Sequence, residues 1–220
     1  MPEMQEVLAA FLSQPAVLAV WAAVALGSAY VVWRDLAGPN AGMGRLMTAV
    51  WVLTALYSGP LGVLIYWKTG RRQIARDSLW RRGWRSTAHC YSGCGMGEIV
   101  GLILAVGILA LDTWPTALIT FAFAFTFGLV LTIGPLMSDG VALGTATKDA
   151  FLSETASITV MEVVAIGVDL WLSAGATIGQ TLFWTSMAVS LTLGLLAAWP
   201  VNVALVALGV KEGMADPRNH

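Results

Sequence analysis

The sequence predicts an all-α, polytopic helical membrane protein with about six transmembrane helices arranged as three hairpins. Only 11% of its 220 residues are charged, whereas a soluble domain carries about 25%. Hydrophobic residues make up 57% of the chain, and apolar runs of about 20 residues, long enough to cross the hydrocarbon core, recur along it. This composition excludes a disordered chain, a nucleic-acid binder with a basic face and an ordinary soluble enzyme.

The elements follow from these apolar runs. Residues 1–15 form an interfacial segment, because 2–13 reads as a short helix with Glu3 and Glu6 on its polar side. A cleavable signal peptide is not expected, since the first basic residue is Arg34. A transmembrane domain covers 16–210, and a tail covers 211–220. The six expected spans are 16–34, 46–67, 87–110, 116–137, 150–172 and 181–208.

Basic residues predict the orientation of these spans. Seven of the twelve Lys and Arg residues lie in the loop 68–86, between spans two and three. With six spans, this loop shares a side with the 138–149 loop and the C-terminus, so both termini are expected in the cytoplasm. The loop also carries tryptophans, which favours either a topology anchor or an interfacial helix that binds lipid phosphates or a cytoplasmic partner. Its lipid-facing arginines would be Arg71, Arg72, Arg76, Arg81, Arg82 and Arg85.

Two stripes of residues open the third span. Residues four apart share a helix face, so Cys90, Cys94 and Glu98 form one stripe. The neighbouring stripe is His89, Gly93, Gly97 and Gly101. Glycines at this spacing allow another helix backbone to approach closely. We therefore expect the polar stripe to face the interior of the bundle.

Acidic residues within the spans suggest a pathway. Glu98 and Glu162 lie 11 and 12 residues into their predicted spans, about 17 Å deep at 1.5 Å per residue. No Lys or Arg lies at mid-span to pair with them, and unpaired acids in a membrane mark proton or cation routes. Glu154 and Asp169 extend this predicted pathway. The alternative is that the two glutamates are protonated and bonded to hydroxyl or backbone groups.

Soft donor atoms near the start of the third span suggest a metal site. His89, Cys90, Cys94 and Met96 offer imidazole, thiolate and thioether groups, which suit Cu(I) or Zn(II). Such a site needs further ligands from another helix. The alternative is that the cysteines are small buried apolar residues.

Prolines interrupt the second, fourth and sixth spans. A proline removes an amide donor, kinks a helix and frees a carbonyl that can bind a cation. Packing alone is the other explanation, and the recurrence of the pattern hints at an internal repeat. The expected kink residues are Gly59, Pro60, Gly134, Pro135, Pro200 and Asn202.

Several strings resemble a bacterial membrane family. These are Trp51 to Tyr66 with its Tyr-Ser-Gly-Pro, Ser86 to Cys90 with Gly93, Ser153 to Ser157 followed by Glu162, and Trp199-Pro200-Val201-Asn202 with Gly209 to Met214. Across roughly 16–214 the chain is similar to the family filed as domain of unknown function 4396. The resemblance implies a multi-pass protein of the bacterial inner membrane, a His-Cys pair opening a helix and an association with copper or other heavy metals. It favours His89, Cys90, Pro200 and Asn202 over Cys94.

The predicted function is therefore a metal-handling permease for a copper- or zinc-like cation, with proton-coupled carboxylates at the membrane midplane. A non-catalytic membrane partner or assembly subunit, or a thiol oxidoreductase using Cys90 and Cys94, remains open; otherwise no enzymatic activity is expected. No retinal, haem or nucleotide is expected, because the lysines lie at predicted membrane edges, one histidine lies in a span and no P-loop is present. Expected partners are the lipid bilayer and a further copy or another membrane protein, without nucleic acid.

Overall fold

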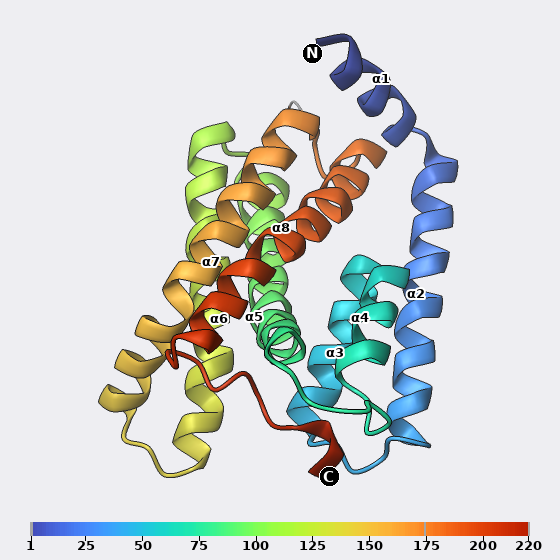
Figure 1. Cartoon of the computed structure of the whole chain (residues 1–220). Helices are drawn as coiled ribbons and strands as arrows, with labels where there is room; N and C mark the ends of the chain where they lie inside the picture. Colours follow the sequence, from blue (N-terminus) through green and yellow to red (C-terminus); the bar gives the residue numbers. More distant parts are fainter. Residues whose placement is uncertain (1, 174, 220) are drawn as a thin grey trace.

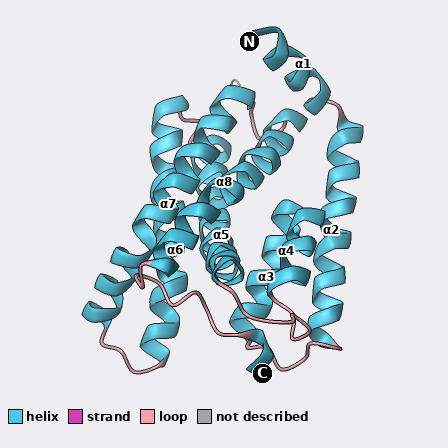
Figure 2. Cartoon of the chain, in the orientation of Figure 1, coloured by secondary structure: helices cyan, strands magenta, loops and turns pink. Residues whose placement is uncertain are grey.

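The computed structural model describes residues 2–173 and 175–219, and the regular structure in these residues is helical throughout (Figures 1 and 2). The predicted all-α, polytopic membrane fold is confirmed. Five helices are long and apolar enough to cross a membrane. They are α2 (Pro15–Ala37), α5 (Leu79–Leu102) with its π-helical continuation η1 (Ile103–Ile108), α6 (Thr113–Ser138), α7 (Leu143–Ser173) and α8 (Thr181–Ala207).

The second predicted span is not a single helix but two short ones, α3 (Arg45–Ser58) and α4 (Pro60–Thr69). Gly59 between them has φ 56°, a value that glycine adopts readily, and Pro60 starts the new helix. The predicted kink at this Gly-Pro pair is therefore a reversal of the chain. At 1.5 Å per residue, α3 and α4 are about 21 and 15 Å long, well short of the ~30 Å hydrocarbon core.

Close packing holds α3 and α4 together as an antiparallel hairpin. A methyl group on Gly62 would lie 2.7 Å from the Cα of Ala55, so the two backbones touch there. Nearer the hairpin's open end, the Trp51 and Tyr66 rings lie 5.4 Å apart. The hairpin thus enters and leaves the bundle at one end (Figure 1). Among the described residues the structure therefore has five candidate spans, where the sequence predicts about six.

The two ends of the chain lie at opposite ends of the bundle (Figure 1). The side of a membrane that each terminus faces, which the sequence predicts to be the cytoplasm for both, stays a prediction. The ends of α2 and α4, the starts of α3, α5 and α7 and the segment after α8 lie towards the end that carries the C-terminus (Figure 1), which we call the basic end. These parts of the chain, with the connections between them, carry all twelve basic residues. They are Arg34, Arg45, Lys68, Arg71, Arg72, Arg76, Arg81, Arg82, Arg85, Lys148, Lys211 and Arg218.

Helix α5 lies at the centre of the bundle and contacts α3, α6, α7 and α8. Its residues 85–95 are all buried. The predicted glycine stripe packs on α6: added methyl groups on Gly93, Gly97 and Gly101 would lie 3.0 Å or less from backbone atoms of that helix. The polar stripe beside it is consequently enclosed, as predicted.

The N-terminal segment forms the short helix α1 (Pro2–Leu12) at the end opposite the basic end (Figure 1). Two hydrogen bonds fasten it to the bundle: Gln5 Nε2 donates to the Trp171 carbonyl (2.6 Å), and Thr185 Oγ1 donates to the Leu12 carbonyl (2.8 Å). Met4, Val7 and Phe11 are exposed. The predicted helix is therefore present, while its position at a membrane interface stays a prediction.

Candidate functional site: a buried polar column

Polar side chains form a column through the interior, mainly between α5 and α7. Both helices start nearer the basic end than the opposite end and run in the same general direction (Figure 1). From the basic end towards the opposite end, the column contains Lys211, Glu154, Ser157, Cys90, Cys94, Glu162, Glu98 and Asp169.

A buried ion pair closes the column at the basic end. Lys211, in the segment after α8, donates from Nζ to Glu154 Oε2 (2.6 Å), Asn202 Oδ1 (2.7 Å) and Ser157 Oγ (3.1 Å). The Lys211 and Glu154 side chains are only 4% and 7% exposed. The Lys211 ammonium group thus balances the charge of the Glu154 carboxylate. Lys211, which the sequence places at a membrane edge, is one of the buried residues of the site.

The two cysteines follow on α5. Their Sγ atoms lie 3.9 Å apart, and Cys90 Sγ lies 3.8 Å from Ser157 Oγ on α7. Both cysteines are free thiols and are buried. The i, i+4 spacing therefore places both sulfurs on the face that meets α7, in line with the two acids.

The other two predicted metal ligands lie elsewhere. His89 is buried, its Nε2 has no partner among the described residues, and its electrostatic neighbours are Glu154 and Lys211. Met96 is half-buried and packs against the apolar core. Within residues 2–173 and 175–219, no three His, Cys, Asp or Glu residues are grouped to hold a metal ion. The four predicted ligands do not form one preformed centre.

Glu98 and Glu162 form the middle of the column. Each lies 19 residues beyond the first residue of its helix, and the two carboxyl groups are close enough to interact electrostatically. They are 1% and 0% exposed. Within the described chain, Glu98 Oε2 and both carboxyl oxygens of Glu162 lack hydrogen-bond partners. A buried carboxyl in such surroundings needs a proton or a cation.

Asp169 continues the column towards the opposite end. It accepts hydrogen bonds from Ser186 Oγ (2.7 Å) and Ser173 Oγ (3.4 Å), and it interacts electrostatically with Glu98. A cavity of about 20 Å³ lies between the two acids, with Thr120 in its wall. This volume is enough for one water molecule, so Glu98 and Asp169 line a shared space that can hold one water.

The arginines of the predicted basic loop mostly bind protein groups. Residues 70–78 connect α4 to α5 and do not form a separate interfacial helix. Arg85 is 1% exposed and donates to both carboxylate oxygens of Asp77, so the expectation that it faces lipid is wrong. Arg71 pairs with Asp35, Arg72 donates to the Ala41 carbonyl, Arg81 to the Lys68 carbonyl and Arg82 to the Glu212 carbonyl, whereas Arg76 is exposed.

Among the predicted kink residues, Asn202 joins the site. Pro135 and Pro200 lie inside α6 and α8, which continue past them. Gly134 is exposed, with open space around it. Asn202 is fully buried and accepts a hydrogen bond from Ser86 Oγ (3.1 Å) as well as the one from Lys211.

Sequence reasoning missed Lys211, Ser86 and Thr120 as members of the site. A signal for Lys211 was present, because Glu154 near the start of a span needs a counter-ion and Lys211 lies in one of the strings that carry the resemblance. The docking of the tail is a tertiary contact between residues 57 positions apart. Periodicity along one helix cannot reveal such a contact.

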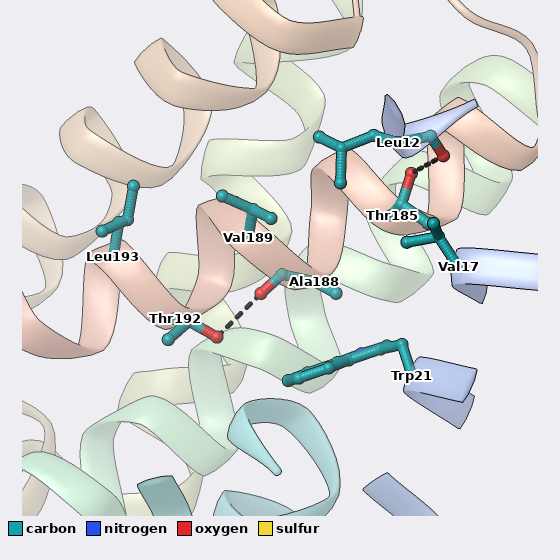
Figure 3. A pocket seen from close by; sticks show the side chains of 8 residues that line it. All are labelled: Leu12, Val17, Trp21, Thr185, Ala188, Val189, Thr192 and Leu193. Atoms are coloured by element: carbon teal, nitrogen blue, oxygen red, sulfur yellow. Dashed lines mark hydrogen bonds between the residues drawn. The ribbon is translucent and has the colours of Figure 1, made fainter. Parts of the chain in front are cut away.

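A larger hollow lies away from the column, between α8 and the α1–α2 junction (Figure 3). Its volume is about 240 Å³, and its walls are almost entirely apolar. The hydroxyl groups of Thr185 and Thr192 in its wall donate to the carbonyls of Leu12 and Ala188. It therefore offers an apolar surface whose threonine hydroxyl groups are hydrogen-bonded.

Fold and column together define a polytopic α-helical membrane protein with ionisable groups buried along its interior. Residues 79–211 match the family described as Domain of unknown function (DUF4396), and the chain belongs to this family. The match covers more than half of the chain, begins with α5 and ends at Lys211, so it contains the whole column. No curated protein matches the chain, and no solved structure does.

Proposed function

We propose that this protein is a proton-coupled permease for a small cation, in which Glu98 and Glu162 bind protons or cargo alternately. The observation that carries the proposal is that these two buried carboxyl groups, whose oxygens are largely unpartnered among the described residues, lie within electrostatic range of each other on a column that runs from Glu154 to Asp169. Two adjoining carboxyl groups resist simultaneous ionisation. A cation that enters between them therefore displaces protons, and its departure lets protons return.

Charge balance sets the stoichiometry of this exchange. A monovalent cation displaces one proton from the pair and a divalent cation displaces two, so the buried charge stays constant through the cycle. Constant charge matters because an uncompensated charge at this depth costs several kcal/mol. Asp169, connected to Glu98 through the small cavity, is suited to pass the proton on towards the end opposite the basic end.

The paired thiols favour a soft cation, copper or zinc, as cargo. Their Sγ atoms lie 3.9 Å apart, and two thiolates bound tetrahedrally to one zinc at 2.3 Å would be about 3.8 Å apart. Each thiol would release its proton as the metal binds and regain it as the metal leaves. Glu162 interacts electrostatically with Cys90, so a carboxylate is near the thiols. Two donors hold an ion less firmly than four, and weak sites suit conduction because a transported ion must also leave.

Positive charge favours a bacterial inner (cytoplasmic) membrane with the basic end inside the cell. All twelve basic residues gather there, and cytoplasmic loops carry the excess of Lys and Arg. The C-terminus would then be cytoplasmic and the N-terminus external. The thiols and the Lys211–Glu154 pair would lie on the cytoplasmic side of the two carboxyl groups, so the cargo meets the thiols first when it enters from the cytoplasm.

Flux through reconstituted vesicles tests this function. Purified protein is placed in proteoliposomes with a pH-sensitive dye inside, and Cu(I) or Zn(II) is added outside. Wild-type protein should couple metal entry to proton exit, whereas Glu98→Gln, Glu162→Gln and the double variant should lose the coupled flux. Asp139→Asn, which changes an exposed acid in the loop between α6 and α7, is the matched control and should keep it. Wild-type flux in the folded double variant would refute the proposal.

A second arm of the experiment tests the soft-metal part. Cys90→Ser and Cys94→Ser should each reduce copper or zinc flux and lower the metal found by elemental analysis of protein purified with that metal. Both variants should leave the fold unchanged, because serine is close in volume to cysteine. Equal metal content in wild type and both variants would exclude these thiols from the route while leaving the carboxyl pair to be judged by the flux assay.

A further inference from the structure

Three oxygen atoms surround the Lys211 ammonium group inside the bundle. Glu154 and Ser157 supply a carboxylate and a hydroxyl from α7, and Asn202 supplies an amide oxygen from α8, at 2.6, 3.1 and 2.7 Å. A primary ammonium has three N–H donors, so this set satisfies all of them. The geometry is that of a site built around one small positive ion.

Contacts inside the bundle keep two of these oxygens, those of Asn202 and Ser157, in place without help from Lys211. Asn202 Nδ2 donates to the Ala198 carbonyl at 3.0 Å, which directs Oδ1 towards the ammonium group, and Ser86 Oγ donates to the same oxygen at 3.1 Å. Ser157 also donates to the Glu154 carbonyl at 3.1 Å. Ser86, Ser157 and Asn202 are fully or almost fully buried. The site therefore belongs to the helices, whereas its occupant belongs to the segment after α8.

The segment after α8 is suited to insert the Lys211 side chain into the site and to withdraw it. Lys211 lies between Gly209 and Gly213, whose φ values are 71° and 80°, so the chain turns on both sides of it with a geometry that glycine allows. Arg82 binds the Glu212 carbonyl from outside the bundle, with Nε 3.1 Å from the oxygen. These contacts hold the segment over the end of the column, at the surface of the basic end.

We propose that the oxygens of Glu154, Ser157 and Asn202 form a binding site for a small monovalent cation of the ammonium class, which Lys211 occupies as a tethered ammonium group. A free cation of that class competes with Lys211 for the same oxygens. If the protein is a permease as proposed above, an entering cation must displace Lys211, and the segment after α8 then gates the cytoplasmic mouth. The binding site itself does not depend on that function.

Thermal unfolding of the full chain in detergent tests the site. Lys211→Met removes the ammonium group, and its flexible thioether side chain can turn aside so that one free ammonium ion fits beside Glu154. In sodium chloride this variant should unfold at a lower temperature than wild type. Ammonium or methylammonium chloride at equal ionic strength should raise its midpoint in a saturable manner, as expected for a ligand that binds the folded state. Tetramethylammonium, which has no N–H donor, should have no effect.

Controls separate a site from a general salt effect. Wild type and Lys148→Met, which changes an exposed lysine of α7, should show no ammonium-dependent rise. The double variant Glu154→Gln/Lys211→Met should lose the response, because the carboxylate is gone. If Lys211→Met cannot be isolated in sodium chloride, the yield of monodisperse protein purified in ammonium chloride becomes the readout, and rescue is expected there as well.

The outcomes are distinct. An unresponsive Lys211→Met, or an equal response with and without the Glu154 carboxylate, shows that Lys211 is only a structural ion pair and overturns the proposal. The assay measures no transport, so a saturable ammonium response in a protein without metal-coupled proton flux would support this site and overturn the permease alone. Metal-coupled proton flux without a saturable ammonium response would support the permease and overturn this site.

Discussion

Arg85 is one of the largest fully buried side chains of the protein, and its environment shows how charge is tolerated near the basic end. Its guanidinium donates to both oxygens of Asp77, at 3.0 and 2.8 Å, and to the Thr69 carbonyl at 3.3 Å. These hydrogen bonds connect the end of α4, the loop between α4 and α5, and the second turn of α5. Arg85 therefore fixes where the central helix begins relative to the hairpin.

Replacement of Arg85 by alanine should destabilise the protein by about 2 kcal/mol. Breaking a buried pair costs ~3–5 kcal/mol, and the 18% exposure of Asp77 lowers that figure. Chemical or thermal unfolding in detergent measures the change. Arg218→Ala removes an exposed pair with Asp216 and should cost less than about 1 kcal/mol at neutral pH; equal losses in both variants would contradict the buried role of Arg85.

Asp216 predicts how the C-terminal turn responds to pH. The hydrogen bonds from the Arg218 side chain lower the pKa of the Asp216 carboxyl to about 2. A carboxyl group with a lowered pKa stabilises the folded state at pH values above the group's ordinary pKa. That contribution is lost as the pH falls from there through about 2. Changes between about pH 5 and 8 should therefore leave this turn intact, and pH effects in that range must arise elsewhere.

At the scale of elements, the contact between α5 and α6 depends on the absence of side chains. An added methyl group on Gly97 would lie 2.6 Å from the Cα of Ala124. Two backbones that approach this closely cannot admit it without moving. Tight backbone contact is a main source of helix association in lipid, where the hydrophobic effect contributes little.

Gly97→Ala should therefore cost about 1–3 kcal/mol through overpacking. Gly134→Ala is the matched control on α6, because no atom lies within 4 Å of the added methyl group, and it should be neutral or slightly stabilising. Thermal midpoints of the two variants, measured in the same detergent, give the comparison. A neutral Gly97→Ala would show that α5 and α6 can separate at no cost.

The sequence could predict features that depend on one helix at a time. The glycine stripe and the Cys90–Cys94–Glu98 face follow from a spacing of four, and the matching depth of Glu98 and Glu162 follows from the rise per residue. The α3–α4 hairpin could not be predicted in this way, because residues 46–67 are as apolar and as long as a true span. Its reversal depends on the backbone at Gly59 and on the contact of Gly62 with Ala55, and both are properties of the folded chain.

For the whole molecule, a hairpin that does not cross the membrane would leave five crossings and put the two termini on opposite sides, and labelling can test this. Single cysteines at Gln14, Asp112 and Asp139 occupy exposed positions at the two ends of the bundle. In intact spheroplasts, a membrane-impermeant thiol reagent should label Gln14→Cys and Asp112→Cys but reach Asp139→Cys only after lysis. The native cysteines are buried and give a low background. Protection of Gln14→Cys together with labelling of Asp112→Cys would indicate six crossings.

The enclosure of α5 also bears on how the protein is made. This helix carries His89, Cys90, Cys94 and Glu98 on surfaces that the folded bundle covers. A newly synthesised α5 released alone into lipid would expose these groups to acyl chains, at a cost of about 2.5–3.5 kcal/mol for a charged residue at the helix centre. The helices that cover most of it, α6, α7 and α8, are synthesised later. We therefore expect α5 to stay beside the insertion machinery during biogenesis until α6, α7 and α8 have been synthesised. The bundle would then be completed only when these later helices cover α5, its most polar helix.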